Sequence, residues 1–339
     1  KPPTARVDLR GHGLEATGHP WLGCAAPLAG SEGLLLTGRI AQRGSVWLAD
    51  HVVSGVPLVP GTALLELALE AGRRARTPFV TEFTLEEPMA LPSGEGLRLQ
   101  LTLQAPGADG ERPFALYSKT DAEDEPWTRH GAGTLAASAP PPRPEFDELR
   151  RWPVAGTEPR DLSGFYEGLA ARGLCYGPAF RGLVELRRDP RRPATVFGRV
   201  MLSPSAQESG ALGIHPALLD AALHTVLGLT PDGASEGEVL IPYTWSGVAL
   251  FASGSSELRV RATLERKAGE AVVSMILADA EGEPVAQIDA LRVRAVRPEQ
   301  LRGAEPHRRL PHLYRIEPQS VALPEPRTRT GFLVITPSA

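Results

Sequence analysis

Residues 63–69 read ALLELAL, and residues 217–223 read ALLDAAL. The two stretches agree at five of seven positions, and both carry an acid at a sixth, Glu66 and Asp220, with an offset of 217 − 63 = 154 residues. Each is apolar over most of its surface, which is typical of a buried helix. The match predicts two copies of one fold, each built around its own central helix.

Strand-like segments accompany each of these two helices. In the first half they lie at 79–85, 96–103, 113–119 and 128–135; in the second half they lie at 183–188, 195–202, 239–250, 257–265, 271–278 and 284–296. We expect the central helices near 62–71 and 216–228, a short helix near 162–172, and two short strands within 34–49 around a turn at 43–45. This repeated order predicts an α+β fold with antiparallel sheets.

Proline-rich segments suggest where the chain divides. Residues 138–160 contain six prolines and little periodicity, so we expect a linker over the surface there. The predicted units are an N-terminal subdomain at 1–137, this linker, and a C-terminal subdomain at 161–297. Residues 298–339 show no helical pattern and are expected to be a linker toward a further domain.

Composition excludes several classes of function. The formal net charge of −4 and the scattered arginines disfavour binding to nucleic acid or to an anionic membrane. No apolar run approaches the length of about 20 residues that spans a bilayer. The two cysteines, Cys24 and Cys175, cannot form a disulfide framework and lack the spacing of metal ligands. We expect a cytoplasmic protein without a metal site.

The first residues suited to chemistry form the pattern His51-x3-Gly55-x4-Pro60, between a strand and an apolar helix. Gly55 can bring a bare backbone N–H toward a ligand, and the start of the helix adds partial positive charge. A carbonyl oxygen could be held there. The alternative is that His51 has a structural role beside turn-forming residues.

A partner for His51 is suggested by Asp220, in the middle of an apolar helix. Loss of water raises the pKa of a buried carboxyl, so Asp220 could be a proton donor near neutral pH. His224 lies four residues on, on the same helix face, and could hydrogen-bond this carboxyl. The alternative places Asp220 on the polar edge of the helix. A dyad requires His51 and Asp220 to converge although 220 − 51 = 169 positions separate them.

Three ordered motifs resemble those of polyketide synthase dehydratase domains from bacterial modular type I synthases. His51 to Pro60 is similar to the family's HxxxGxxxxP, residues 173–180 (GLCYGPAF) to GYxYGPxF, and Asp220 to His224 to DxxxQ/H. Leu174 departs from the second motif, where the family has an aromatic residue. With further similar strings, the resemblance covers about residues 19–296.

The resemblance implies a double hotdog fold with the active site in a tunnel between two halves. It implies that His51 removes the α-proton of a β-hydroxyacyl thioester, and that Asp220 protonates the departing hydroxyl. Tyr176 would position this hydroxyl and His224 would orient Asp220. The motif residues Gly55, Pro60 and Gly177 would help to hold the substrate.

The resemblance also implies partners and leaves more than one function open. The substrate would arrive on the phosphopantetheine arm of an acyl carrier protein, the domain would bind no cofactor of its own, and it would be a homodimer among other synthase domains. The same motifs would serve a domain that closes an oxygen heterocycle or moves the double bond. A further alternative is a catalytically silent module, which the intact dyad disfavours. Another is a hotdog thioesterase, which would need an activated water.

Overall fold

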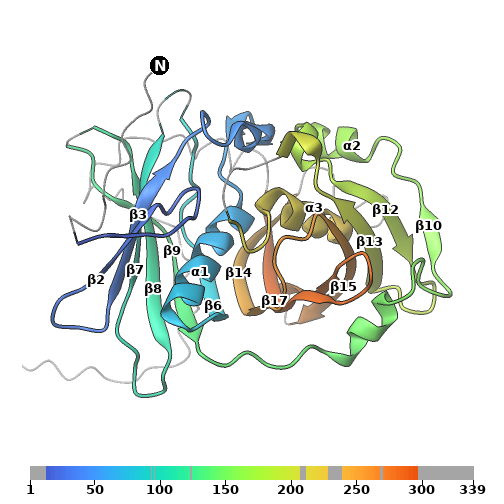
Figure 1. Ribbon diagram of the computed structural model, residues 1–339. Coiled ribbons are helices and arrows are strands. Elements are labelled where there is room, and N and C mark those ends of the chain that lie inside the picture. The colour runs from blue at the N-terminus through green and yellow to red at the C-terminus, as the bar shows by residue number, and fades with distance from the viewer. Residues whose placement is uncertain are drawn as a thin grey trace, which may run out of the picture. The chain divides into compact units, whose positions relative to one another are not determined.

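The computed structural model describes residues 13–92, 94, 96–122, 124–206, 211–227, 239–267 and 270–296. The expectation for residues 298–339 therefore lies outside the described residues. Two helices, each partly enclosed by antiparallel strands, dominate the structure (Figure 1). None of the described helices is long and apolar enough to cross a membrane.

In the first half, the helix α1 (Gly61–Ala75) lies against an antiparallel sheet (Figure 1). Every residue from Thr62 to Gly72 is buried, which explains why this segment is apolar on most of its faces. The helix ends at Arg76, which adopts a left-handed conformation with φ of 58°. The strands of this half, in sheet order, are β1 (Glu15–Ala16), β2 (Cys24–Pro27), β3 (Leu34–Ile40), β7 (Leu97–Leu103), β8 (Arg112–Lys119), β9 (Thr128–Ala136) and β6 (Phe79–Leu85).

The second half repeats this arrangement around α3 (Pro216–Leu227). Its strands, in sheet order, are β14 (Val239–Leu250), β17 (Pro284–Val296), β16 (Glu270–Ala278), β15 (Glu257–Lys267), β13 (Thr195–Met201), β12 (Leu183–Arg188) and β10 (Glu158–Arg160). A short helix, α2 (Phe165–Ala171), precedes β11 (Leu174–Tyr176). The two predicted central helices are thus confirmed.

The two halves join along a strand pair and a helix pair. β6 pairs antiparallel with β14, with Phe83 opposite Trp245, so that one sheet of 14 strands runs through the described residues. α1 also packs against α3, where the hydroxyl of Thr62 donates to the carbonyl of Pro216 at 3.0 Å. One apolar core therefore spans both halves.

The prediction of a second strand before His51 is wrong. After β3, residues 41–45 turn, and a 3-10 helix, η2 (Val46–Asp50), leads to His51. Trp47 and Leu48 are adjacent and both buried, whereas a half-buried strand would place consecutive side chains on opposite faces. Trp47 packs on His215, with ring centroids 4.6 Å apart, a contact that local alternation cannot reveal.

The proline-rich segment at 138–160 is more than a surface linker. It contains a 3-10 helix, η3 (Pro144–Leu149), and the strand β10. Phe146 and Leu149 are buried in a small second core together with Phe197 of β13. This segment therefore packs along the second half, because its isolated apolar side chains contact residues that are distant in the sequence.

Candidate active site

A tight hairpin places His51 in the interior. β4 (His51–Val53) and β5 (Val56–Pro57) pair antiparallel. The two residues between them, Ser54 and Gly55, have φ of 51° and 85°, as in the two-residue turns that suit hairpins. Gly55 is thus required for the turn, and it is not among the residues that line the cavity described below.

The tautomer of His51 follows from its hydrogen bond. Its Nδ1 lies 2.9 Å from the carbonyl oxygen of Leu58. A carbonyl can only accept, so Nδ1 carries the proton and Nε2 keeps its lone pair. Burial lowers the pKa of His51, and the charge of Asp220 opposes this shift only in part. His51 is therefore built as a neutral base whose free nitrogen is Nε2.

Tyr176 stands beside His51 because β11 pairs antiparallel with β4, where Tyr176 and His51 are directly opposite. The next residue, Gly177, lies very close to the side chain of Asp50. A Cβ on Gly177 would lie 2.3 Å from Cγ of Asp50. The N–H of Gly177 donates to the carbonyl of Asp50 at 2.8 Å, and the N–H of Ala179 donates to its Oδ2 at 2.9 Å. Sequence analysis missed Asp50, whose only signal is its position next to His51.

Asp220 and His224 lie one turn apart on α3, and both side chains are buried. Nε2 of His224 is 3.1 Å from Oδ2 of Asp220. This contact is within ion-pair distance, but its angles are not those of a hydrogen bond, and both buried atoms lack a well-aligned partner within the part of the chain that the structure describes. Each atom is therefore left available to the other by a small rotation of the side chains.

The protonation expected for Asp220 needs correction. Burial raises the pKa of Asp220, as the sequence predicts, but the hydrogen bond and charge of His224 and the charge of His51 outweigh burial. The pKa of Asp220 is therefore lowered from its ordinary value. The expectation from the sequence considered only the loss of water; it named His224 as a hydrogen-bond partner but did not weigh that bond, or the charge of the distant His51, against burial.

One cavity of about 200 Å³ brings the predicted residues together. His51 and Tyr176 line it, as do Asp220 and His224 from α3. Most of the remaining wall consists of aliphatic side chains from both halves. The structure does not place Gly55, Pro60 or Gly177 on this wall. These three residues shape the chain behind it: Pro60 caps α1, and its carbonyl accepts the N–H groups of residues 63 and 64.

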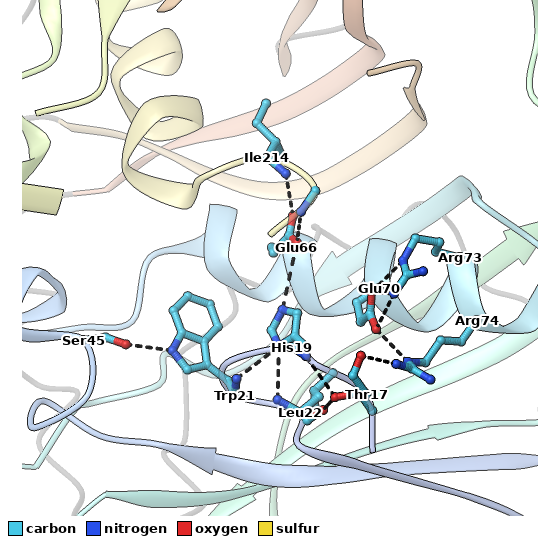
Figure 2. Close-up of polar contacts among 11 residues, drawn as sticks. Thr17, His19, Trp21, Leu22, Ser45, Glu66, Glu70, Arg73, Arg74 and Ile214 are labelled. Carbon is cyan, nitrogen blue, oxygen red and sulfur yellow. Dashed lines mark hydrogen bonds and ion pairs between the residues drawn. The ribbon is translucent and has the colours of Figure 1, made fainter. Parts of the chain in front are cut away.

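A second buried acid, Glu66, lies on α1 at the position that the sequence repeat matches with Asp220. Figure 2 shows its carboxylate between the halves: Oε1 accepts the N–H of Gly213 at 2.6 Å, and Oε2 accepts that of Ile214 at 3.1 Å. Nε2 of His19 lies 3.9 Å from Oε1. Burial raises the pKa of Glu66 to about 7 and lowers the pKa of His19 to about 4. Sequence analysis gave neither residue a role; the repeat was the available signal.

Comparison with known proteins agrees with this geometry. Two family models match the chain: "Polyketide synthase dehydratase domain" over residues 19–119 and "Polyketide synthase dehydratase N-terminal domain" over residues 145–303. Polyketide synthase GfsA of Streptomyces halstedii is 40% identical over 320 residues, which are 94% of this chain and 4% of that protein. The chain thus spans a small part of the curated relatives that it matches.

Solved structures agree as well. The dehydratase domain from the terminal module of the rifamycin polyketide synthase is 35% identical, with a TM-score of 0.75 over 85% of this chain and 100% of that one. A bifunctional dehydratase-cyclase domain in ambruticin biosynthesis is 39% identical, with a TM-score of 0.77 over 84% of this chain and 99% of that one. The chain belongs to the polyketide synthase dehydratase family, and the expected double hotdog fold is confirmed.

This membership fixes the reaction class. Polyketide synthase dehydratase domains are hydro-lyases that act on β-hydroxyacyl thioesters, and this chain is one of them. The predicted dehydratase function and enzyme class are therefore confirmed.

Proposed function

We propose that this domain eliminates water with His51 as the base and Asp220 as the acid. Nε2 of His51 takes a proton from Cα of the β-hydroxyacyl thioester, and the electron pair left behind forms the Cα–Cβ double bond. The Cβ–O bond breaks while Asp220 gives its proton to the departing hydroxyl, which leaves as water. The observation that carries this assignment is that a base with a free Nε2 and a buried carboxyl line one cavity.

The reacting form of the dyad is the uncharged one, with the proton on Asp220 and none on Nε2 of His51. Burial is the largest single influence on the pKa of both groups, and it opposes charge on each. An acyl chain in the cavity would exclude water and strengthen this influence. Substrate binding would therefore raise the pKa of Asp220, which takes its proton from solvent, while His51 stays neutral. After elimination the proton on His51 returns to the carboxylate and restores the dyad.

The start of α1 is suited to bind the carbonyl oxygen of the thioester. Gly61, the first residue of α1, lines the cavity. The first N–H groups of a helix lie at its positive end, and in α1 the carbonyl of Pro60 takes only those of residues 63 and 64 among the described contacts. We infer that the carbonyl oxygen, which gains negative charge as Cα loses its proton, is stabilised there. The sequence predicted that Gly55 holds this oxygen. Gly55 would instead contribute indirectly, by forming the turn that leads the chain back toward α1.

Tyr176 is placed to bind the β-hydroxyl of the substrate. Its ring centroid lies 5.7 Å from that of His51 and 4.3 Å from that of His224, so it stands beside the proposed base and beside the histidine next to the proposed acid. Burial keeps the pKa of Tyr176 well above its ordinary value, so the phenol retains its proton and can donate to a substrate oxygen.

The relatives are parts of polyketide synthases, so neighbouring synthase domains are partners of this domain. Within that setting, we propose that the substrate arrives as a thioester on the phosphopantetheine of an acyl carrier protein, and that the domain needs no cofactor of its own. We also propose a homodimer and a cytoplasmic location, which suits the free thiols of Cys24 and Cys175. Light scattering of the purified domain tests the dimer; a monomer at high concentration would contradict it.

The experiment that tests the dyad is incubation with a β-hydroxyacyl carrier protein or its pantetheine analogue, with loss of water followed by mass spectrometry. His51→Ala and Asp220→Asn should each lower turnover by about 10²–10⁴ because each removes one proton-transfer group. The double variant should be little worse than either single one, since members of a catalytic unit are strongly non-additive. Asp109→Asn, an exposed loop variant, is the matched control and should keep full turnover.

The same assay distinguishes simple dehydration from the related functions. Folded Asp220→Asn protein with parental turnover would overturn the proposed acid. A product that has lost water and then closed a ring, or whose double bond has moved, would add the cyclase or isomerase activity to the same dyad. A folded parent that releases no water from any such substrate would favour the silent module.

A further inference from the structure

Tyr166, which belongs to none of the family motifs, reaches the proposed acid through His224. It lies on α2, and its hydroxyl oxygen is 3.5 Å from Nδ1 of His224. The two rings meet edge to face, with centroids 5.7 Å apart. Nε2 of the same imidazole is 3.1 Å from Oδ2 of Asp220, a contact whose angles are not yet those of a hydrogen bond. The three side chains therefore form a chain of polar contacts from α2 into the cavity.

The hydroxyl of Tyr166 is oriented by a backbone group. The N–H of Leu183 donates to it at 3.1 Å, so one lone pair of the oxygen is occupied. The hydroxyl proton is then free to donate, and Nδ1 of His224 is the acceptor that faces it. At 3.5 Å this contact is at the long limit of hydrogen bonding, as is common in catalytic sites without substrate.

This orientation decides the tautomer of His224. An imidazole whose Nδ1 accepts a hydrogen bond carries its proton on Nε2. Nε2–H then faces Oδ2 of Asp220 at 3.1 Å and would donate to it once the two side chains align for the reaction, so Oδ2 is not the oxygen that bears the acid proton. The proton of the acid is left to Oδ1.

We propose that Tyr166 is a positioning residue for the dehydration, which fixes the Nε2–H tautomer of His224 and thereby directs the proton of Asp220 to Oδ1. The proposal rests on the dyad proposed above. Tyr166 touches neither substrate nor reacting atoms, and it acts only through His224.

The surroundings of Tyr166 support a fixed orientation. The guanidinium of Arg181 lies 5.5 Å from the centre of the Tyr166 ring. The same guanidinium donates through Nε to the carbonyl oxygen of Tyr176 at 2.9 Å. Tyr166 thus contacts both a cation and His224, and His224 also contacts Tyr176.

The test is the steady-state turnover of Tyr166→Phe in two backgrounds. In the parent, the variant should lower kcat about tenfold and leave KM unchanged, because one orienting hydrogen bond is lost while the cavity wall keeps its shape. In a His224→Ala background, Tyr166→Phe should cause no further loss. Tyr117→Phe, which removes a hydroxyl from the half-buried strand β8 of the first half, is the matched control and should leave kcat unchanged.

A direct readout is the tautomer of His224, followed by ¹⁵N NMR of histidine-labelled protein and assigned by comparison with His224→Ala. The parent should show a protonated Nε2 and an unprotonated Nδ1, and Tyr166→Phe should show a mixture of tautomers. Thermal unfolding of each variant shows that it is folded.

The failure of this inference can be distinguished from failure of the dyad. If Tyr166→Phe lowers kcat by the same factor in both backgrounds, or if the tautomer of His224 does not change, Tyr166 has a structural role only and the inference is overturned. If instead His51→Ala and Asp220→Asn keep their turnover, the proposed dyad itself fails.

Discussion

Glu66 and Asp220 occupy matched positions on the two central helices, yet their carboxylates have opposite surroundings. Both oxygens of Glu66 accept backbone N–H groups of Gly213 and Ile214, from the segment that leads into α3. Asp220 lines the cavity instead, and its Oδ2 lies 3.1 Å from Nε2 of His224. The internal repeat therefore carries one acid that joins the two halves and one that is available for chemistry.

The pKa of His51 in the free domain should lie below 6.5, because burial lowers it. The imidazole should therefore stay neutral as pH falls to 6.5 and take up a proton only below that value. ¹⁵N NMR titration of histidine-labelled protein between about pH 5 and 8, assigned by comparison with His51→Ala, measures this pKa. Protonation of His51 above pH 6.5 would show that it is not the desolvated base.

Substitutions of His224 should separate hydrogen bonding from charge. His224→Gln keeps a donor that can reach Asp220 from the same helix face, and it should retain most of the parental kcat. His224→Ala leaves Oδ2 of Asp220 without its neighbour and should lower kcat about tenfold, since one hydrogen bond contributes up to about 1.5 kcal/mol. Equal losses in both variants, measured by the same loss of water, would mean that charge rather than donation matters.

The stability of the domain should depend on pH through Glu66. The pKa of Glu66 is raised from 4.5 to about 7 in the folded state, so the folded protein binds this proton more tightly than the unfolded chain. The contribution of this proton is fully present below pH 4.5 and is lost as pH rises through about 7. The loss amounts to at most about 3 kcal/mol.

Chemical unfolding of the parent and of Glu66→Gln at several pH values measures this contribution. The difference in unfolding free energy between the two proteins should change between pH 4.5 and about 7, since the amide of the variant does not titrate. Glu125→Gln, an exposed control, should follow the parent. A constant difference between parent and Glu66→Gln would contradict the raised pKa of Glu66.

Glycine is required at position 177 by the approach of Asp50. In Gly177→Ala the new Cβ would meet the carboxyl carbon of Asp50 at 2.3 Å, and that carboxylate is held by the N–H of Ala179. We expect a loss of about 1–3 kcal/mol in unfolding free energy from this overpacking, and a lower kcat because Tyr176 is the adjacent residue.

Gly168→Ala is the matched control for this change. Gly168 lies within α2, and no atom would lie within 4 Å of an added Cβ. Thermal unfolding should show a gain of about 0.5–1 kcal/mol for Gly168→Ala. Similar behaviour of the two alanine variants would contradict the clash at Asp50.

Local patterns were sufficient wherever neighbours in the sequence decide the structure. Apolar periodicity predicted the two central helices, α1 and α3, nearly at their observed bounds. Three strands have the predicted bounds: β6, β12 and β14. The segment at 46–50 failed because contacts of Trp47 with His215, rather than local alternation, decide its conformation.

The sequence by itself determined the repeat, the fold class, and His51 and Asp220 as candidates, because these depend on residue type and spacing. Only the tertiary structure decided which groups share a cavity, which nitrogen of His51 is free, and that Tyr166 contacts His224 while Asp50 holds the chain at residues 177–179. It also reversed the pKa shift expected for Asp220. Electrostatic interactions act through space, so the protonation of a buried carboxyl depends on side chains that the fold brings to it from distant parts of the chain.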